Sequence, residues 1–247
     1  MNANVKTIDA RVGRLLVVLS IVLGLSLVSM LTVWLYPDLI WLDKWMEVKI
    51  NSCNTPWFDR FWFQFTSRWT WVPLMVVTLY SLFRACKGSV KRKLAFVLVS
   101  LLVVVLLDQL SSGVIKPLAQ RLRPSHDPSI CYLLHFVDGY RGGRYGFVSG
   151  HATNIVGIAT WLCLLFRQQW FRIACIVFAV ALCYSRLYLG VHFPGDVLCG
   201  ALLGNVIALL SFHWVGSRFE IDHSYRPLGL VVVMIVTTLV VAVIATV

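Results

Sequence analysis

The sequence has little charge, and acidic residues are the scarcest part of it. Only 13% of its 247 residues are charged, with 11 acidic against 22 basic side chains, whereas soluble domains carry about 25% charged residues. The hydrophobic content is 59% and the mean hydropathy is +0.79. A chain with so little polar surface does not form a water-soluble globule of this size, so the composition indicates a membrane protein.

The spacing of the cysteines and the distribution of the positive charge argue against zinc-binding and nucleic-acid-binding functions. The seven cysteines form no C-x-x-C pair and no Cys/His cluster with zinc-ligand spacing. Cys53 and Cys131 fall in loops expected on the same side of the membrane, and whether they form a disulfide stays open because spacing alone does not decide it. The net charge of +11 does not indicate nucleic-acid binding, since the basic residues lie in short clusters beside apolar stretches. We therefore expect no nucleic-acid partner.

Seven apolar stretches approach the length of about 20 residues that a helix needs to cross a bilayer. They are Leu15–Tyr36, Trp69–Phe83, Leu94–Ile115, Ile155–Phe166 with the preceding turn, Ile173–Leu189, Val197–Trp214 and Leu228–Val247. The aromatic-rich segment Asp38–Arg68 is expected to lie along the lipid headgroups. The sequence thus predicts an all-α, polytopic transmembrane bundle. It forms a single domain over 1–247, with its motifs in a core at 94–214 and an additional C-terminal span at 228–247.

The charges of the connecting loops predict the orientation of these spans. The connection at 84–93 carries basic residues and no acid, and 167–172 adds further basic residues, whereas the charges of 37–68 balance. By the positive-inside rule, the amino terminus and both basic connections then face the cytoplasm. The loops 37–68, 116–150 and 190–196 fall on the opposite side.

Three short motifs lie at that opposite side. They read Lys116-x6-Arg123-Pro124, Ser149-Gly150-His151 and Ser185-Arg186-x5-His192-x3-Asp196. Any one basic residue at a helix end is ordinarily a snorkelling side chain. Lys116, Arg123 and Arg186 beside paired histidines instead suggest a clamp for the equatorial oxygens of a phosphoryl group.

The remaining motif residues suggest a nucleophile and its helpers. Ser149 and Gly150 open an expected helix, whose free N–H groups and positive dipole end favour phosphate. The spacing of His192 and Asp196 allows the carboxylate to accept a bond from one imidazole nitrogen while the other faces a substrate. The alternative for this pair is a simple helix cap. Pro117, directly after Lys116, is expected to interrupt regular helix geometry.

Together, the three motifs resemble the signature blocks of the type 2 phosphatidic acid phosphatase superfamily, in its bacterial membrane lipid phosphatase branch. The resemblance implies a six-helix core, to which the C-terminal span would be an addition, and a metal-independent reaction without a cofactor. It implies that His192 forms a phosphohistidine, that Asp196 orients it, and that His151 protonates the leaving oxygen. The phosphate-binding residues would be Lys116, Arg123, Ser149, Gly150 and Arg186. One position departs from the family pattern, because Val148 stands where proline usually precedes Ser-Gly-His.

The substrate is expected to be a lipid phosphate, because the motifs lie at the mouth of an apolar bundle. The segment Gly139–Ala152 resembles that of lipid A phosphatases, which places lipid A first, undecaprenyl diphosphate second, and phosphatidylglycerophosphate or phosphatidic acid third. In the loop before Ser149, Arg141 and Arg144 are candidates for a second phosphate or for plain surface solvation. The expected location is a bacterial inner membrane with the active site facing the periplasm, and the oligomeric state stays open.

One intramembrane acid and one other class of function complete these expectations. Asp108 lies in an apolar span, where an acid is either functional or packed against a polar neighbour such as Gln109. A transporter, or a pseudoenzyme that binds anionic lipid, is the non-enzymatic alternative. Transport is disfavoured because ionisable residues gather at one face, and a pseudoenzyme because His151, His192 and Asp196 are all present.

Overall fold

A computed structural model describes residues 37–247, and the regular secondary structure of this part of the chain is helical apart from two isolated β-bridges. The first expected span, Leu15–Tyr36, lies outside the described residues. The α-helices are α2 (Pro37–Asn51), α3 (Pro56–Phe65), α4 (Val72–Ala85), α5 (Val90–Asp108), α6 (Lys116–Ala119), α7 (Gly150–Leu165), α8 (Gln169–Tyr188), α9 (Pro194–Trp214) and α10 (Leu228–Ile244). The expected all-α transmembrane bundle is confirmed.

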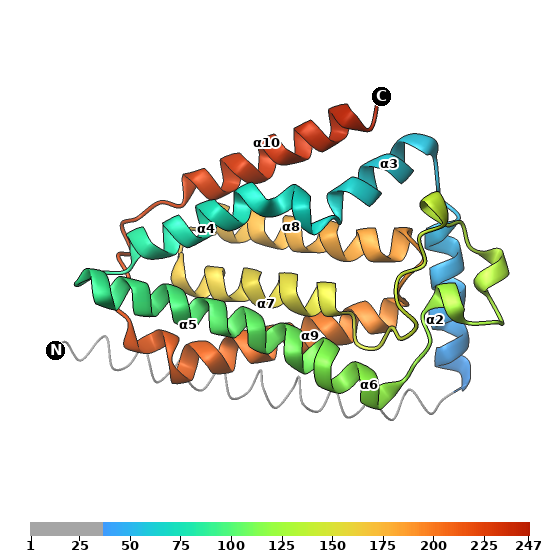
Figure 1. Ribbon diagram of the computed structural model, residues 1–247, viewed down its shortest axis with the longest axis horizontal. Helices are drawn as coiled ribbons and strands as arrows, with labels where there is room; N and C mark the ends of the chain where they lie inside the picture. The colour runs from blue at the N-terminus through green and yellow to red at the C-terminus, as the bar shows by residue number, and fades with distance from the viewer. Residues whose placement is uncertain (1–36) are drawn as a thin grey trace.

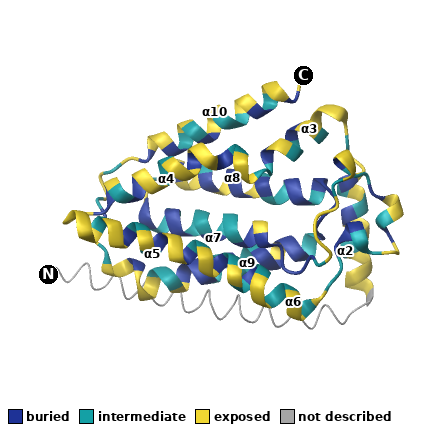
Figure 2. Cartoon of the chain, viewed as in Figure 1, coloured by how far each residue is buried: buried dark blue, intermediate teal, exposed yellow. Residues whose placement is uncertain are grey.

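Helix α7 is at the centre of the bundle. It packs against α5, α8 and α9, while α10 covers α3, α4 and α8 from outside. These helices run along the long axis of the molecule, and α2 crosses them at one end, beside the loop that leads into α7 (Figure 1). Apolar side chains remain exposed along the outer helices α5 and α10, as expected for surfaces that face lipid (Figure 2).

Three helical segments of the described chain are long and apolar enough to cross a membrane: Val90–Ala119, Gln169–Tyr188 and Pro194–Arg218. Helices α7 and α10 are shorter apolar helices. The third span begins at Val90 instead of the expected Leu94, because the Ser89 side chain accepts a hydrogen bond from the first turn of the helix. The fourth begins at Gly150, and the Ser149 side chain caps it, as the second motif predicted.

The irregularity expected at Pro117 lies on its N-terminal side. Gln109–Ile115 forms a π-helix between α5 and α6, and the helix continues through Pro117 to Ala119. Proline lacks the N–H of a regular turn, and a π segment before it already breaks the i to i−4 ladder. The span ends at Gln120, whose left-handed φ of 48° turns the chain into the long loop.

Glycines let α7 and α9 approach closely beside the motifs. A Cβ atom at Gly204 would overlap the backbone of Thr153, and one at Gly200 would lie 2.5 Å from the carbonyl oxygen of Ser149. The first turns of α7 and α9, which carry the second and third motifs, are therefore fixed against each other.

Asp108, whose role the sequence left undecided, links α5 to α7. The side-chain amide of Asn154 on α7 donates to Asp108 Oδ1 on α5 at 3.2 Å. This contact favours the packing interpretation of Asp108. Cys53 and Cys131, whose pairing the sequence left open, are both free thiols.

Candidate active site

The three motifs meet at the end of the bundle that α2 crosses (Figure 1). Lys116 begins α6, Ser149 caps α7, Arg186 lies near the end of α8, and Asp196 lies in the first turn of α9. Residues far apart in sequence are thereby brought to one place, which is the arrangement that the motif spacings predicted.

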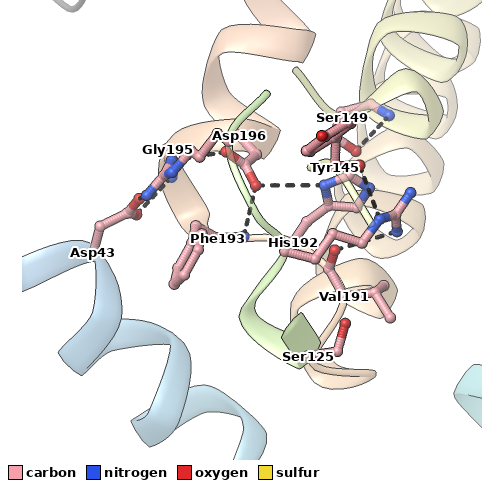
Figure 3. A network of polar contacts seen from close by, with 12 residues as sticks. Asp43, Ser125, Tyr145, Ser149, Val191, His192, Phe193, Gly195 and Asp196 are labelled. Atoms are coloured by element: carbon pink, nitrogen blue, oxygen red, sulfur yellow. Dashed lines mark hydrogen bonds and ion pairs between the residues drawn. The ribbon is translucent and has the colours of Figure 1, made fainter. Parts of the chain in front are cut away.

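His192 and Asp196 form a buried pair. His192 Nδ1 lies 3.5 Å from Asp196 Oδ2, and only 1% and 0% of the two side chains are exposed (Figure 3). The same oxygen accepts a hydrogen bond from the backbone N–H of Phe193 at 3.1 Å. Pro194 occupies the first turn of α9, where its fixed φ suits a helix start. The helix cap and the imidazole contact therefore share one carboxylate, so the cap is present and the catalytic interpretation of the pair stays a prediction.

His192 is neutral in this environment. Burial lowers its pKa well below the ordinary value, and the positive charges of Arg123, Arg186 and Lys116 lower it further. A hydrogen bond with the backbone of Gly146 opposes this shift without reversing it. A neutral imidazole keeps a lone pair, which is what a nitrogen nucleophile requires.

The two arginines of the motifs are buried and held by neighbouring groups. Arg123 donates from Nε to the carbonyl of Tyr145 at 3.1 Å and from Nη1 to that of Val191 at 3.3 Å. Burial, together with the charge of Arg186, lowers the pKa of Arg123 to about 10, which leaves it charged at neutral pH. The second bond ties the guanidinium to the residue that precedes His192.

Arg186 is only 2% exposed, yet part of its guanidinium remains available. Its Nη1 donates to Thr66 Oγ1 at 2.8 Å and its Nη2 to the hydroxyl of Tyr140 at 3.4 Å, while Nε has no hydrogen-bond partner among the described residues. A buried donor without a partner costs free energy unless a ligand or water meets it. The unpartnered Nε makes Arg186 a candidate donor to an anion.

The start of α7 completes the site. The backbone N–H of Ser149 donates to the carbonyl of Asp196 at 3.0 Å, and its hydroxyl caps the helix. A Cβ atom at Gly150 would lie 2.6 Å from Ser112 Oγ and 3.9 Å from Lys116 Nζ, so glycine is needed for this approach. His151, next in the chain, has an exposed side chain. Partial desolvation of its imidazole, followed by the positive charges of Arg186, Arg123 and Lys116, lowers its pKa well below the ordinary value.

A cavity of about 350 Å³ opens beside the cations. Its lining residues are Ser112, Lys116, Pro117, Gln120, Arg123, Gly143, Arg144 and Tyr145. Of the two loop arginines that the sequence left open between a second phosphate and surface solvation, Arg144 lines the cavity. Arg141 instead lies with its guanidinium carbon 4.7 Å from the centre of the Phe136 ring.

Three ionisable residues that the motifs do not specify lie behind His192. Arg121 pairs with Asp196 and with Asp43, and Glu47 is completely buried nearby. Asp43 and Glu47 lie one turn apart in a segment that composition assigned to the headgroups, and Arg121 was one more basic residue near a helix end. The i,i+4 spacing of the acids was the available signal. No group of three histidine, cysteine, aspartate or glutamate side chains that could hold a metal ion occurs within residues 37–247.

Comparison with known proteins places these features in a family. A family model described as the PAP2 superfamily matches residues 97–220, which include all three motifs. The lipid A 4'-phosphatase of Bacteroides thetaiotaomicron is 37% identical over 185 residues, covering 73% of this chain and 81% of that protein. The lipid A 4'-phosphatase of Porphyromonas gingivalis is 36% identical over 166 residues, covering 67% and 70%. A transmembrane PAP2-type phosphatidylglycerolphosphate phosphatase from Bacillus subtilis shares the fold, with a TM-score of 0.63 and 23% identity over 80% of this chain and 96% of that one.

Proposed function

The chain belongs to the PAP2 superfamily of membrane lipid phosphatases, and we propose that it removes a phosphate from lipid A. Phosphatase activity is supported by the convergence of the His192–Asp196 pair with Lys116, Arg123 and Arg186 at one end of an apolar bundle. Lipid A as the substrate is supported by the two similar lipid A 4'-phosphatases.

The proposed reaction begins with the phosphate held by cations. Lys116, Arg123 and Arg186 neutralise its oxygens, and Ser149 and Gly150 add the N-terminal end of α7. Nε2 of His192 attacks phosphorus, so a P–N bond forms as the P–O bond to the lipid breaks. Asp196 holds the proton on Nδ1 and stabilises the positive imidazole that results.

His151 handles the proton of the leaving group. It donates a proton to the departing lipid oxygen and afterwards takes one from water. That water attacks phosphorus, the P–N bond breaks, and inorganic phosphate and neutral His192 are released. The exposure of His151 beside a buried His192 suits this division, because the proton carrier must exchange with solvent and the nucleophile must not.

The cavity beside the cations has room for a headgroup larger than a phosphate group alone. Arg144 lies in its wall next to Lys116 and Arg123, so a substrate whose phosphate meets the motif cations would also meet a fourth positive charge. A phosphorylated sugar headgroup is the kind of substrate that uses this surface, with its acyl chains remaining in the bilayer.

We place the active end at the periplasmic face of a bacterial inner membrane. The basic connections 84–93 and 167–172 lie at the opposite end of the bundle from α2 and the site (Figure 1). The positive-inside rule assigns that basic end to the cytoplasm.

The test is phosphate release by the purified protein in detergent with EDTA present. The panel contains lipid A, undecaprenyl diphosphate, phosphatidylglycerophosphate and phosphatidic acid. We expect release from lipid A that is abolished by His192→Ala and unaffected by His213→Ala, which changes an exposed histidine near the other end of α9. Preference for another lipid would overturn the substrate proposal, and turnover by His192→Ala would overturn the mechanism. Binding without turnover by the native protein would favour the pseudoenzyme alternative.

A further inference from the structure

We propose that Arg121 and Asp43 are positioning residues, which hold the carboxylate of Asp196 in the orientation that His192 needs for catalysis. This inference rests on the proposed function, because it assigns a task to residues beside the same nucleophile. Arg121 occupies one of the unspecified positions between Lys116 and Arg123 in the first motif, and Asp43 lies on α2, outside the region that the family model matches.

The contacts form a closed ring around the start of α9. Arg121 Nη1 donates to Asp196 Oδ1 at 2.7 Å, and Arg121 Nη2 donates to Asp43 Oδ2 at 2.6 Å. Asp43 Oδ1 accepts from the backbone N–H of Gly195 at 2.7 Å, and Gly195 is bonded directly to Asp196 (Figure 3). The planar guanidinium spans the two carboxylates, which a single ammonium does less well.

This ring determines how Asp196 faces the imidazole. Oδ1 is taken by Arg121, so Oδ2 is the oxygen left for Phe193 N–H and for His192 Nδ1. If Arg121 were absent, Oδ1 would lose its donor and the carboxylate would be free to rotate. His192 would then lose both its fixed tautomer and a correctly placed negative charge.

Burial and charge make the arrangement costly to disturb. The side chain of Arg121 is 11% exposed, that of Asp43 14%, and that of Asp196 0%. The guanidinium of Arg121 also lies 4.3 Å from the centre of the Phe193 ring, so it packs against the residue between the nucleophile and the helix. Burial by itself lowers the pKa of Arg121, but attraction to Asp196 and Asp43 outweighs it and raises the pKa. Arg121 is therefore committed to these acids, unlike Arg186 with its unpartnered nitrogen.

The position of the ring predicts a kinetic signature different from that of a phosphate-binding arginine. A residue that acts through Asp196 changes the transition state and leaves substrate binding alone, so kcat falls while KM stays. Arg123 and Arg186, which are proposed to touch phosphate, should change KM as well.

The experiment measures kcat and KM for phosphate release by the full chain in detergent, together with the unfolding midpoint from tryptophan fluorescence. For Arg121→Gln we expect kcat to fall about 100-fold, less than the ~10⁴-fold loss that disabling the acid of a triad produces, with KM within about 3-fold. Arg121→Lys should recover part of the loss because it keeps the charge, and Asp43→Asn should lower kcat about 10-fold.

Asp127→Asn is the matched control. Asp127 lies in the loop and pairs at 2.8 Å with Lys44, which is on α2 like Asp43. The substitution therefore removes an ion pair between the loop and α2 that does not reach Asp196. Its kcat should stay within about 2-fold of the native value. The inference is overturned if folded Arg121→Gln keeps native kcat, if it raises KM alone, or if Asp127→Asn loses as much activity as Asp43→Asn.

A separate measurement distinguishes failure of this inference from failure of the proposed function. If the native protein releases no phosphate from any lipid tested, the proposed function fails, and the ring is then tested by unfolding alone. Substitutions Arg121→Gln and Asp196→Asn, made singly and together, should lower the unfolding midpoint non-additively because they share one interaction. Additive effects would overturn the ring.

Discussion

Replacing the buried acid Glu47 by glutamine should give a variant whose stability advantage over the native protein grows as the pH rises. Glu47 lies on α2, one turn after Asp43, with 0% of its surface exposed and with neither carboxyl oxygen hydrogen bonded. Burial raises its pKa well above the ordinary value, and the negative charges of Asp196 and Asp43 raise it further, while Arg121 opposes them. The folded protein therefore keeps this carboxyl protonated at pH values where an exposed glutamate is ionised.

The sign of the pH dependence follows from proton counting. In the unfolded chain Glu47 ionises near its ordinary pKa of 4.5. Above that pH and up to the raised pKa of the folded state, the folded protein binds one more proton than the unfolded chain. The free energy of unfolding therefore falls as the pH rises through this window, by up to about 1.4 kcal/mol per pH unit for this group. Glu47→Gln has nearly the same shape and no proton to lose, so it removes this dependence.

Unfolding midpoints measured across the pH range test the prediction. We expect Glu47→Gln and the native protein to differ little near pH 4 and to diverge as the pH rises, with about 2–4 °C for each kcal/mol in a protein of this size. Glu220→Gln is the control, because Glu220 is an exposed acid that pairs with Lys87 at 3.1 Å. A constant difference between the native and Glu47→Gln curves would refute the protonated carboxyl, as would divergence of equal size in the control.

Three further predictions concern packing and the phosphate clamp. Gly204→Ala should cost about 1–3 kcal/mol of stability, because the added methyl overlaps the facing helix; the same change at Gly229, where the nearest atom is 3.5 Å from the added carbon, should be tolerated in an unfolding scan. Arg123→Lys should raise KM and lower kcat about 10-fold or more, since an ammonium does not reproduce two directed guanidinium bonds. Tyr140→Phe removes one 3.4 Å contact of Arg186 and should lower kcat/KM only a few-fold, so a loss as large as that of Arg123→Lys would contradict the assignment of Tyr140 as a neighbour of the clamp.

The sequence was most informative where chemistry is encoded by short-range spacing. His192 and Asp196 lie within one turn at a helix start, so local geometry brings them together almost regardless of the rest of the fold. Hydrophobic runs likewise predicted the helices, because a bilayer imposes their length. The start of α7 was predicted by its Ser149 cap, whereas the start of α5 was not, since Ser89 extends that helix through a cap that apolar periodicity does not reveal.

The groups behind the nucleophile could not be predicted from spacing. Asp43 and Arg121 meet only because α2 folds across the end of the bundle, and their separation along the chain carries no signal of that contact. Amphipathic patterning shows which positions are polar. It does not show whether the polar face meets water or, as for Glu47, a closed interior beside other acids. The aromatic side chains around these positions favoured the headgroup interpretation for the whole segment.

Positive and negative side chains lie on different sides of His192. The cations Lys116, Arg123 and Arg186 act on the imidazole from the side proposed to bind phosphate, whereas Asp196 and Asp43 are joined behind it by Arg121. With Glu47 protonated, two carboxylates and one guanidinium leave a single net negative charge there. In the proposed mechanism that charge balances the single positive charge which His192 would gain when its nitrogen bonds to phosphorus. Ionising Glu47 would leave an excess negative charge without a partner, and removing Arg121 would do the same. The protonated state of Glu47 and the two bonds of Arg121 are therefore parts of one requirement: a balanced buried charge behind a neutral nucleophile.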